Sequence, residues 1–146
     1  MPQLSTDTAS ELVNQLMGDR AVAHVATLTP NGDPHVTPMW FHYDNSAFWF
    51  VSPHDADKVK HIQQDGRVAL SISDTELPYR AVMARGKARV IDDGTAMQLT
   101  RDLQNRYIGS TEEELSFTEE EKNVAIQVAV DHMESWTATT RRKSSV

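Results

Sequence analysis

The 146-residue sequence contains no cysteine, which excludes disulfide scaffolds, thiolate zinc sites, iron–sulfur clusters and thiol nucleophiles. Its six glycines are all isolated, so no glycine-rich loop is available to cradle a nucleotide phosphate. No apolar run reaches the roughly 18 residues of a membrane span, and residues Met1–Arg20 lack the layout of a secretory signal. These absences predict a cytoplasmic protein with a single domain over residues 1–146, since domains are commonly about 150 residues long.

Basic side chains are also scarce, because 14 lysines and arginines are outnumbered by 21 aspartates and glutamates, giving a formal charge of −7. The excess negative charge lies between Glu112 and Glu121, and outside this segment the two signs nearly balance. Such a surface lacks the positive field that neutralises nucleic-acid phosphates, so neither nucleic acid nor a membrane is expected as a partner. The basic cluster Arg141–Lys143 is interpreted as part of a solvated tail.

The hydrophobic pattern predicts a mainly β protein with six antiparallel strands and short inserted helices. Strands are expected at residues 21–28, 35–43, 47–52, 67–73, 79–91 and 124–131. Helices are expected at residues 8–18, 53–66 and 94–107. Gly86, inside the fifth strand, predicts a bulge or bend of the kind that turns a barrel corner. Together these elements favour a small closed barrel.

Several common chemistries have no support in the sequence. The six histidines are scattered over separate elements, and no pair has the spacing that puts two metal ligands on one helical face. There is no Gly-x-Ser-x-Gly nucleophile elbow, and paired carboxylates are concentrated in the acidic segment, which is interpreted as a solvated face. We therefore predict no metal site and name no catalytic residue.

One constellation points to a ligand site, on the second strand, the third strand and the helix that follows. Pro38 cannot donate to a strand ladder, so the backbone groups around it are free to face a ligand. The third strand ends at Ser52, close to a helix start whose free amides favour an anion. Cationic or polar side chains near that start are those of Lys58, Lys60 and His61.

Aromatic residues accompany this anion-binding corner. Trp40 and Phe41 on the second strand and Phe48 and Trp49 on the third are expected to form one wall. The sequence thus predicts an apolar surface for a flat ring beside a site for an anion.

The order of these segments resembles the pyridoxamine 5′-phosphate oxidase-like split-barrel flavoproteins. The matching stretches are VAHVATLTPNGDPHVTPMWFHYD, FWFVSPHDADKVKHIQQDGRVALSISD, YRAVMARGKARVIDD, NRYIG and AIQVAVDHMESW. The resemblance implies a homodimer of six-stranded antiparallel split barrels, with two cofactors in grooves at the dimer interface. It also implies an oxidoreductase that moves hydride between FMN or the deazaflavin F420 and a small organic acceptor.

The resemblance further implies which residues bind the cofactor. The backbone of Pro38, Met39 and Trp40 would lie along the ring, with Thr37 near its polar edge. Val51 and Ser52 would close the other side. The phosphate would meet Lys58, helped by Lys60 and His61. The residues implied from the partner chain are Tyr79, Arg80 and Trp136.

The short deazaflavin-using branch of the family has a lysine where this sequence has Lys58. This resemblance favours F420 as the cofactor, with FMN as the alternative. His61 departs from that branch, which often has asparagine there. FMN-dependent relatives commonly carry an additional arginine and lysine on the second and third strands, and neither is present here. The basic tail would line the exit of the acidic F420 tail. The proton donor is left open between a tyrosine, a histidine and water.

Two other functions remain open from the sequence. One is a non-catalytic protein that stores or carries a flavin or deazaflavin. The other is a haem-binding protein of the same fold, for which the ligands to suspect are His24, His42 and His61. Oxidation of pyridoxamine phosphate itself is not expected, because no basic site for a substrate phosphate is evident beyond that of the cofactor.

Overall fold

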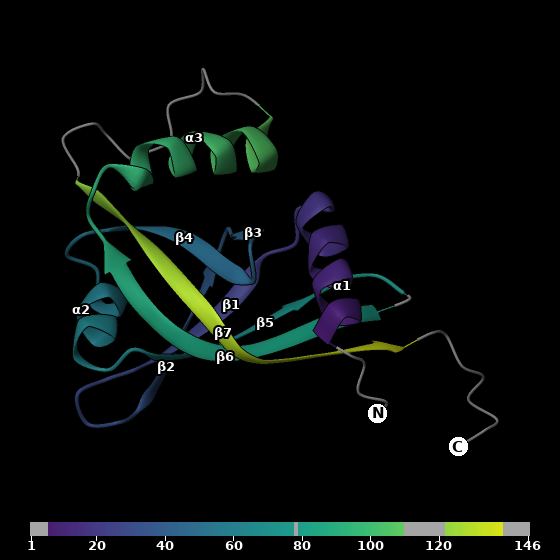
Figure 1. Cartoon of the computed structure of the whole chain (residues 1–146), viewed down its shortest axis with the longest axis horizontal. Helices are drawn as coiled ribbons and strands as arrows, with labels where there is room; N and C mark the ends of the chain where they lie inside the picture. The colour runs from purple at the N-terminus through teal and green to yellow at the C-terminus, as the bar shows by residue number, and fades with distance from the viewer. Residues whose placement is uncertain (1–5, 78, 110–121, 139–146) are drawn as a thin grey trace.

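The computed structural model of the chain describes residues 6–77, 79–109 and 122–138. The acidic segment between Glu112 and Glu121 and the basic cluster Arg141–Lys143 lie outside these residues. The described helices are α1 (Thr6–Gly18), α2 (Asp57–Gln64) and α3 (Thr95–Ile108). The described strands (Figure 1) are β1 (Ala23–Leu28), β2 (Pro34–Met39), β3 (His42–Asp44), β4 (Ala47–Pro53), β5 (Arg67–Ser73), β6 (Tyr79–Ile91) and β7 (Asn123–Ala138).

The strands form one antiparallel sheet in the order β2-β1-β5-β6-β7-β4-β3. The predicted mainly antiparallel β architecture is confirmed, but the prediction of six strands is wrong, because the described residues form seven. The expected second strand divides at Trp40 and Phe41: β2 pairs with β1, whereas β3 pairs with β4 at the opposite edge. Apolar residues continue through this break, so the hydrophobic pattern could not reveal the change of partner.

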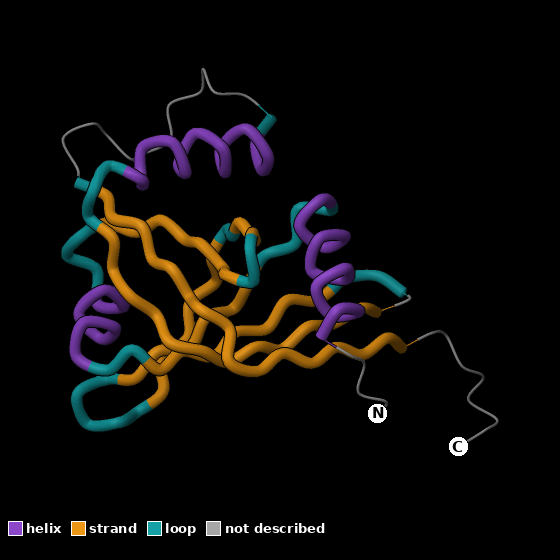
Figure 2. The backbone as a smooth tube through the Cα atoms, in the orientation of Figure 1, coloured by secondary structure: helices purple, strands orange, loops and turns teal. Residues whose placement is uncertain are grey.

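The two edges of the sheet lie close together along the chain, which forces the sheet to curl. β2 ends at Met39 and β3 begins at His42, and three Cα–Cα steps span at most about 11 Å. Within the described residues no strand pairing joins the two edges, so the predicted closed barrel is wrong and the curled sheet is open. Figure 2 shows the curved strands in the centre, with the helices set around them. We call the gap between the edge of β2 and β4 the split.

The bend predicted at Gly86 is confirmed. The register of β6 against β7 shifts between Arg85 and Gly86, where the long paired strands arch across the molecule (Figure 1). A Cβ atom at Gly86 would lie 1.9 Å from the carbonyl oxygen of Ala129, so a side chain cannot be accommodated in this bulge.

Two hydrophobic clusters lie on opposite faces of β4. Phe48 and Phe50 join the main core, which also includes Leu16 of α1. The alternate residues Trp49 and Val51 pack with the cluster under α3. Because successive side chains of a strand point to opposite faces, α3 covers the face of β4 that is turned away from the main core.

The prediction of a shared aromatic wall is therefore wrong. Phe41 and Phe48 are fully buried in the main core, whereas Trp40 and Trp49 are partly buried against the cluster under α3. Strand alternation separates Phe48 from Trp49, since they are neighbours in sequence. Of the four, only the two tryptophans are on the side of the sheet that α3 covers.

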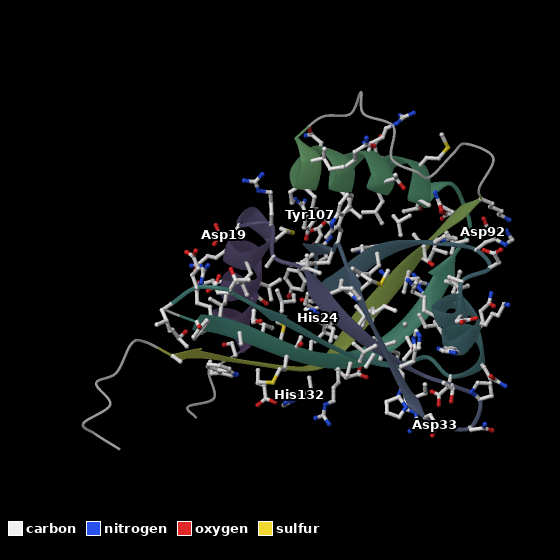
Figure 3. The ribbon with its side chains drawn as sticks, turned by 180° about the vertical axis from the view of Figure 1, so that it is seen from behind. Asp19, His24, Asp33, Asp92, Tyr107 and His132 are labelled. Atoms are coloured by element: carbon white, nitrogen blue, oxygen red, sulfur yellow. The ribbon has the colours of Figure 1, made fainter. Side chains whose placement is uncertain are left out.

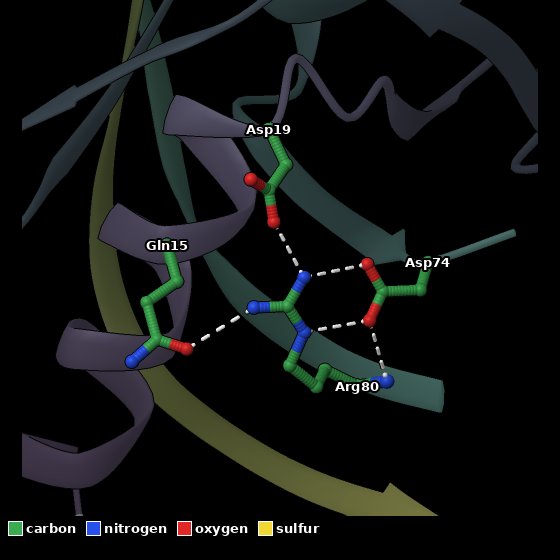
Figure 4. A network of polar contacts seen from close by, with 4 residues as sticks. All are labelled: Gln15, Asp19, Asp74 and Arg80. Carbon is green, nitrogen blue, oxygen red and sulfur yellow. Dashed lines mark hydrogen bonds and ion pairs between the residues drawn. The ribbon is translucent and has the colours of Figure 1, made fainter. Parts of the chain in front are cut away.

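Arg80 ties α1 to the β5–β6 connection (Figure 4). Its Nε and Nη2 atoms form a bidentate pair with Asp74 at 2.6 and 2.8 Å. Nη2 also donates to Asp19 at 2.6 Å, and Nη1 donates to Gln15 at 3.1 Å. Gln15 lies near the end of α1, and Asp19 lies just beyond it. The hydrogen bonds from Arg80 hold the pKa of Asp74 below its usual range. The network thus fastens the end of α1 to the sheet.

We expect Asp74→Asn to lower the free energy of unfolding by about 1–2 kcal/mol at neutral pH, the scale of a partly buried charge-assisted hydrogen bond. Because the folded pKa of Asp74 is lowered, this stabilisation is present above the unfolded pKa of about 3.9 and is lost as pH falls through the folded value. Urea unfolding at about pH 7 and about pH 3 measures it. A difference between wild type and variant that is as large in acid as at neutral pH would contradict the assignment.

Candidate functional site

The split holds a cavity of about 440 Å³. Among the described residues β3 pairs with no more of β4 than Ala47–Trp49, so the following part of β4 faces the split rather than another strand. A volume of this size is typical of small-molecule sites. The residues that line the cavity are Val22, Pro38, Met39, Trp40, Val51, Pro53, Lys58, Thr100 and Leu103.

One wall of the cavity is the edge of β2. Pro38, Met39 and Trp40 all line the cavity, although successive side chains of a strand point to opposite faces. Consistent with that alternation, Pro38 is exposed and Met39 is buried. Pro38 and Met39 end β2, a strand at the edge of the sheet, and Trp40 follows it, so the cavity borders the free edge of the strand at its end. This wall therefore offers peptide groups as well as side chains.

The facing wall comes from β4 and α3. Val51 and Pro53 are two residues apart on β4, so their side chains point to the same side. Thr100 and Leu103 are one turn apart on α3 and cover the cavity from that helix. Lys58 is the one charged member among the described lining residues, so the cavity is a mainly apolar space with a single cation in its lining.

Lys58 lies in the first turn of α2. Its side chain is partly buried, and this burial lowers the pKa of the ammonium group. The described residues provide it with no ion pair and no hydrogen bond. Ala56, the N-cap of α2, gives the first amides of the helix no side-chain hydrogen bond. A partly desolvated cation and an uncapped helix start together favour an anion beside Lys58.

The structure brings together five of the residues that the sequence predicted to bind a cofactor, namely Pro38, Met39, Trp40, Val51 and Lys58. Others on the same elements do not line the cavity. Thr37 lies on the opposite face of β2 from Pro38, and Lys60 is exposed on α2. Ser52 is fully buried and donates its hydroxyl to the carbonyl oxygen of Pro53 at 3.1 Å.

His61 contacts the β1–β2 hairpin. Its Nδ1 atom lies 2.9 Å from Oγ1 of Thr27, and its ring meets the ring of His35 edge to face at 5.2 Å. The side chain is buried in this contact. His61 therefore docks α2, the helix that carries Lys58, onto the hairpin whose second strand forms the wall of the cavity.

The residues predicted to come from a partner chain lie elsewhere on the sheet. Tyr79 and Arg80 begin β6, and Trp136 lies opposite Ala81 near the end of β7. β7 is four strand positions from β2, which is about 19 Å along the sheet. None of these residues lines the cavity of its own chain, and the guanidinium of Arg80 is engaged with Asp74 and Asp19.

The pyridoxamine 5′-phosphate oxidase family matches residues 9–137 of the sequence. The chain belongs to this family. The resemblance seen in the sequence motifs is thereby confirmed, and the match extends over both walls of the cavity and the start of α2. No curated protein matches the sequence significantly.

Solved structures share the family fold. A protein described as an F420 reductase is 28% identical, with a TM-score of 0.70, and the alignment covers 82% of this chain and 94% of that one. A conserved hypothetical protein from Mycobacterium tuberculosis is 20% identical (TM-score 0.73; coverage 98% and 95%). A FAD-binding protein from Mesorhizobium loti is 15% identical (TM-score 0.69; coverage 94% and 98%). The shared fold does not determine the function, because one fold hosts many activities.

Within this family fold, α3 supplies the part of the site that the sequence motifs did not indicate. Thr100 and Leu103 line the cavity, as do Val22 and Pro53. The apolar stripe on α3 predicts a helix that faces a core, and a helix that covers a cavity has the same stripe. Only the three-dimensional arrangement separates the two.

The three histidines suspected as haem ligands do not line the cavity. His24 is exposed, and His61 contacts Thr27. His42 lies 2.9 Å from Arg106 through Nδ1, and burial together with that guanidinium lowers its pKa. In the part of the chain that the structure describes, no three His, Cys, Asp or Glu side chains gather as a metal site would require. The described helices are too short or too polar for any of them to span a bilayer.

Proposed function

We propose that the chain is an oxidoreductase that acts as one cofactor-binding domain, holds F420 in the cavity of the split, and transfers hydride between it and a small organic acceptor. FMN is the alternative cofactor. The observation that carries the proposal is that the end of β2, at Pro38 and Met39, lines the same cavity as Lys58, whose ammonium has no partner among the described residues. A tricyclic ring with a phosphate arm needs both, because its faces are apolar, its rim forms hydrogen bonds and its phosphate is an anion.

The charge of the cavity favours F420 over FMN. Lys58 is the single charged residue among the described residues that line it. F420 carries a phosphodiester with one negative charge, whereas FMN ends in a phosphomonoester whose second proton dissociates near pH 6. A single lysine balances the one negative charge of the phosphodiester, whereas it leaves part of the charge of the FMN phosphomonoester unbalanced. The 28% identical solved relative that is described as an F420 reductase supports the same choice.

When bound, the cofactor supplies the hydride chemistry, and the residues of the chain bind and orient it. Lys58 donates hydrogen bonds to the phosphate, and the edge of β2 offers peptide groups to the rim of the ring. Val51, Pro53 and Leu103 exclude water from its faces. Lys58 is the only titratable residue among the described lining residues, so the rest of this lining would bind and orient the ring rather than transfer a proton.

We further propose that the cavity is completed by a second copy of the chain. A hollow of about 530 Å³ lies over β1, β5, β6 and β7, and Met83 in it is 36% exposed. Pro38 of the cavity pairs with His24, and His24 pairs with Ser71 of this surface, so a partner lying on it would reach the mouth of the cavity. Tyr79 and Trp136 of that partner are the residues proposed to meet the cofactor. A monomer in sedimentation of the cofactor-bound protein would contradict the dimer.

Titration of the cofactor-free protein with F420 and with FMN tests the function. We expect F420 to bind at least about ten-fold more tightly at about pH 8, and the gap to narrow at about pH 5, where the FMN phosphate loses its second charge. Reduced F420 should then be oxidised by small conjugated carbonyl compounds or quinones. Tighter binding of FMN would make FMN the cofactor, and binding without oxidation would make the protein a carrier. Binding of neither cofactor would overturn the proposal.

A further inference from the structure

The last turn of α3 contacts both backbone polar groups of Phe41, which lies where the chain passes from β2 to β3. Phe41, between β2 and β3, donates its backbone N–H to Oη of Tyr107 at 3.3 Å, and its carbonyl accepts a hydrogen bond from Arg106 at 3.0 Å. Oη of Tyr107 also donates to the carbonyl oxygen of Ala21 at 2.6 Å. The Tyr107 hydroxyl therefore links α3 both to Ala21, which precedes β1, and to Phe41, which connects β2 to β3.

Tyr107 also covers one face of Trp40. The two ring centroids lie 4.9 Å apart, and the ring planes differ by 3°. Figure 3 shows the side chain of Tyr107 extending from α3 toward the strands. Trp40 lines the cavity and Tyr107 does not, so the stack holds a residue of the cavity wall by one face of its indole.

Tyr107 belongs to the face of α3 that covers the cavity. Thr100, Leu103 and Tyr107 are spaced i, i+3 and i+7, which places them on one side of a helix. Burial raises the pKa of the Tyr107 hydroxyl, so the group keeps its proton and its ability to donate at neutral pH. Its two hydrogen bonds go to the backbone of the segments that border the split, which distinguishes it from a tyrosine that only fills a core.

We infer that Tyr107 is a positioning residue for the cofactor site: it fixes Trp40 and the Phe41 peptide, and through them the width of the split at the cavity. This inference rests on the proposed function, because the wall that is positioned is the one proposed to hold the ring. Without the hydroxyl, two backbone groups lose their partner. Without the ring, Trp40 is free to change rotamer, and a cofactor would have to order the wall as it binds, which weakens binding.

Binding of F420 by two variants separates the hydroxyl from the ring. Tyr107→Phe keeps the stack, and we expect it to bind about three- to ten-fold more weakly. Tyr107→Leu also loses the stack, which should weaken binding by a further three- to ten-fold, approximately. Tyr43→Phe is the matched control, because it removes another tyrosine hydroxyl, one that is 2.9 Å from Ser10 Oγ and outside the cavity lining. It should bind as the wild type does.

The fluorescence of Trp40 reports on its local environment, and a general loss of stability would not change that signal in the folded protein. Subtracting the fluorescence of a Trp40→Phe counterpart isolates the emission of Trp40, which should change in Tyr107→Leu. The effect of Tyr107→Leu on affinity should also shrink in the Trp40→Phe background, because Tyr107 acts through Trp40.

These measurements separate a failure of the positioning role of Tyr107 from a failure of the proposed function. Wild-type affinity in both Tyr107 variants, affinity losses that simply multiply across the two positions, or an equal loss in Tyr43→Phe would each overturn the positioning role and leave the proposed function standing. If the wild-type protein binds neither F420 nor FMN, the proposed function fails, and the inference fails with it.

Discussion

Replacing Gly86 by alanine is expected to lower the free energy of unfolding by more than about 3 kcal/mol, or to prevent folding altogether. The new Cβ atom would lie 1.9 Å from the carbonyl oxygen and 2.9 Å from the carbonyl carbon of Ala129. Both are backbone atoms of β7, so the clash cannot be relieved by turning a side chain. Either the bulge must open or the pairing of β6 with β7, the two longest strands of the sheet, must break.

Alanine substitutions at two other glycines serve as controls for Gly86→Ala. Gly18→Ala meets no atom within 4 Å at the end of α1, so it should be neutral or slightly stabilising, since alanine favours helix by up to about 1 kcal/mol. Gly66→Ala should fall between the two, because its Cβ atom would lie 2.8 Å from the carbonyl oxygen of Ala88. Equilibrium unfolding in urea measures all three. A Gly86→Ala protein as stable as the wild type would contradict the geometry of the bulge.

Lys58→Met is expected to weaken F420 binding by about 10- to 150-fold, which corresponds to the roughly 1.5–3 kcal/mol of hydrogen bonds to a charged group. The same substitution should leave the cofactor-free protein equally stable or make it more stable. Burial lowers the folded pKa of Lys58, so the cost of the buried charge is present at neutral pH and disappears only above the unfolded pKa of about 10.4. Methionine keeps most of the apolar stem and removes that charge.

Lys60→Met is the matched control on the same helix. Lys60 is exposed and does not line the cavity, yet its replacement changes the net charge by the same amount. Calorimetric titration should show near wild-type affinity for Lys60→Met and a large loss for Lys58→Met. Equal losses would indicate a general effect of charge, and wild-type affinity in Lys58→Met would place the phosphate elsewhere.

The sequence predicts those parts of the fold whose signals are local. The turn at Pro30–Gly32 separates β1 from β2, and Gly86 marks the bulge, because both depend on the backbone preferences of single residues. The break at Trp40 and Phe41 has no local signal. There the chain leaves one strand partner for another at the far edge of the sheet, and that choice is made by long-range pairing.

The same division applies to the candidate site. Pro38 and Lys58 could be singled out because a missing N–H and a cation at a helix start have chemical consequences of their own. The contacts of His61 with Thr27 and of Arg80 with Asp19 could not, since the sheet brings together residues that are far apart in sequence. In the sequence, Tyr107 is only one member of an ordinary apolar stripe on a helix. Its role depends on the position of Trp40, which the sequence does not show.

A crystal structure of the protein with F420 tests the central claim most directly. We expect the ring in the split, between Pro38–Trp40 at the end of β2 and Val51 of β4, with the phosphate within hydrogen-bond distance of Nζ of Lys58. A cofactor bound on the outer face of the sheet, or a phosphate that leaves Lys58 without a partner, would contradict it.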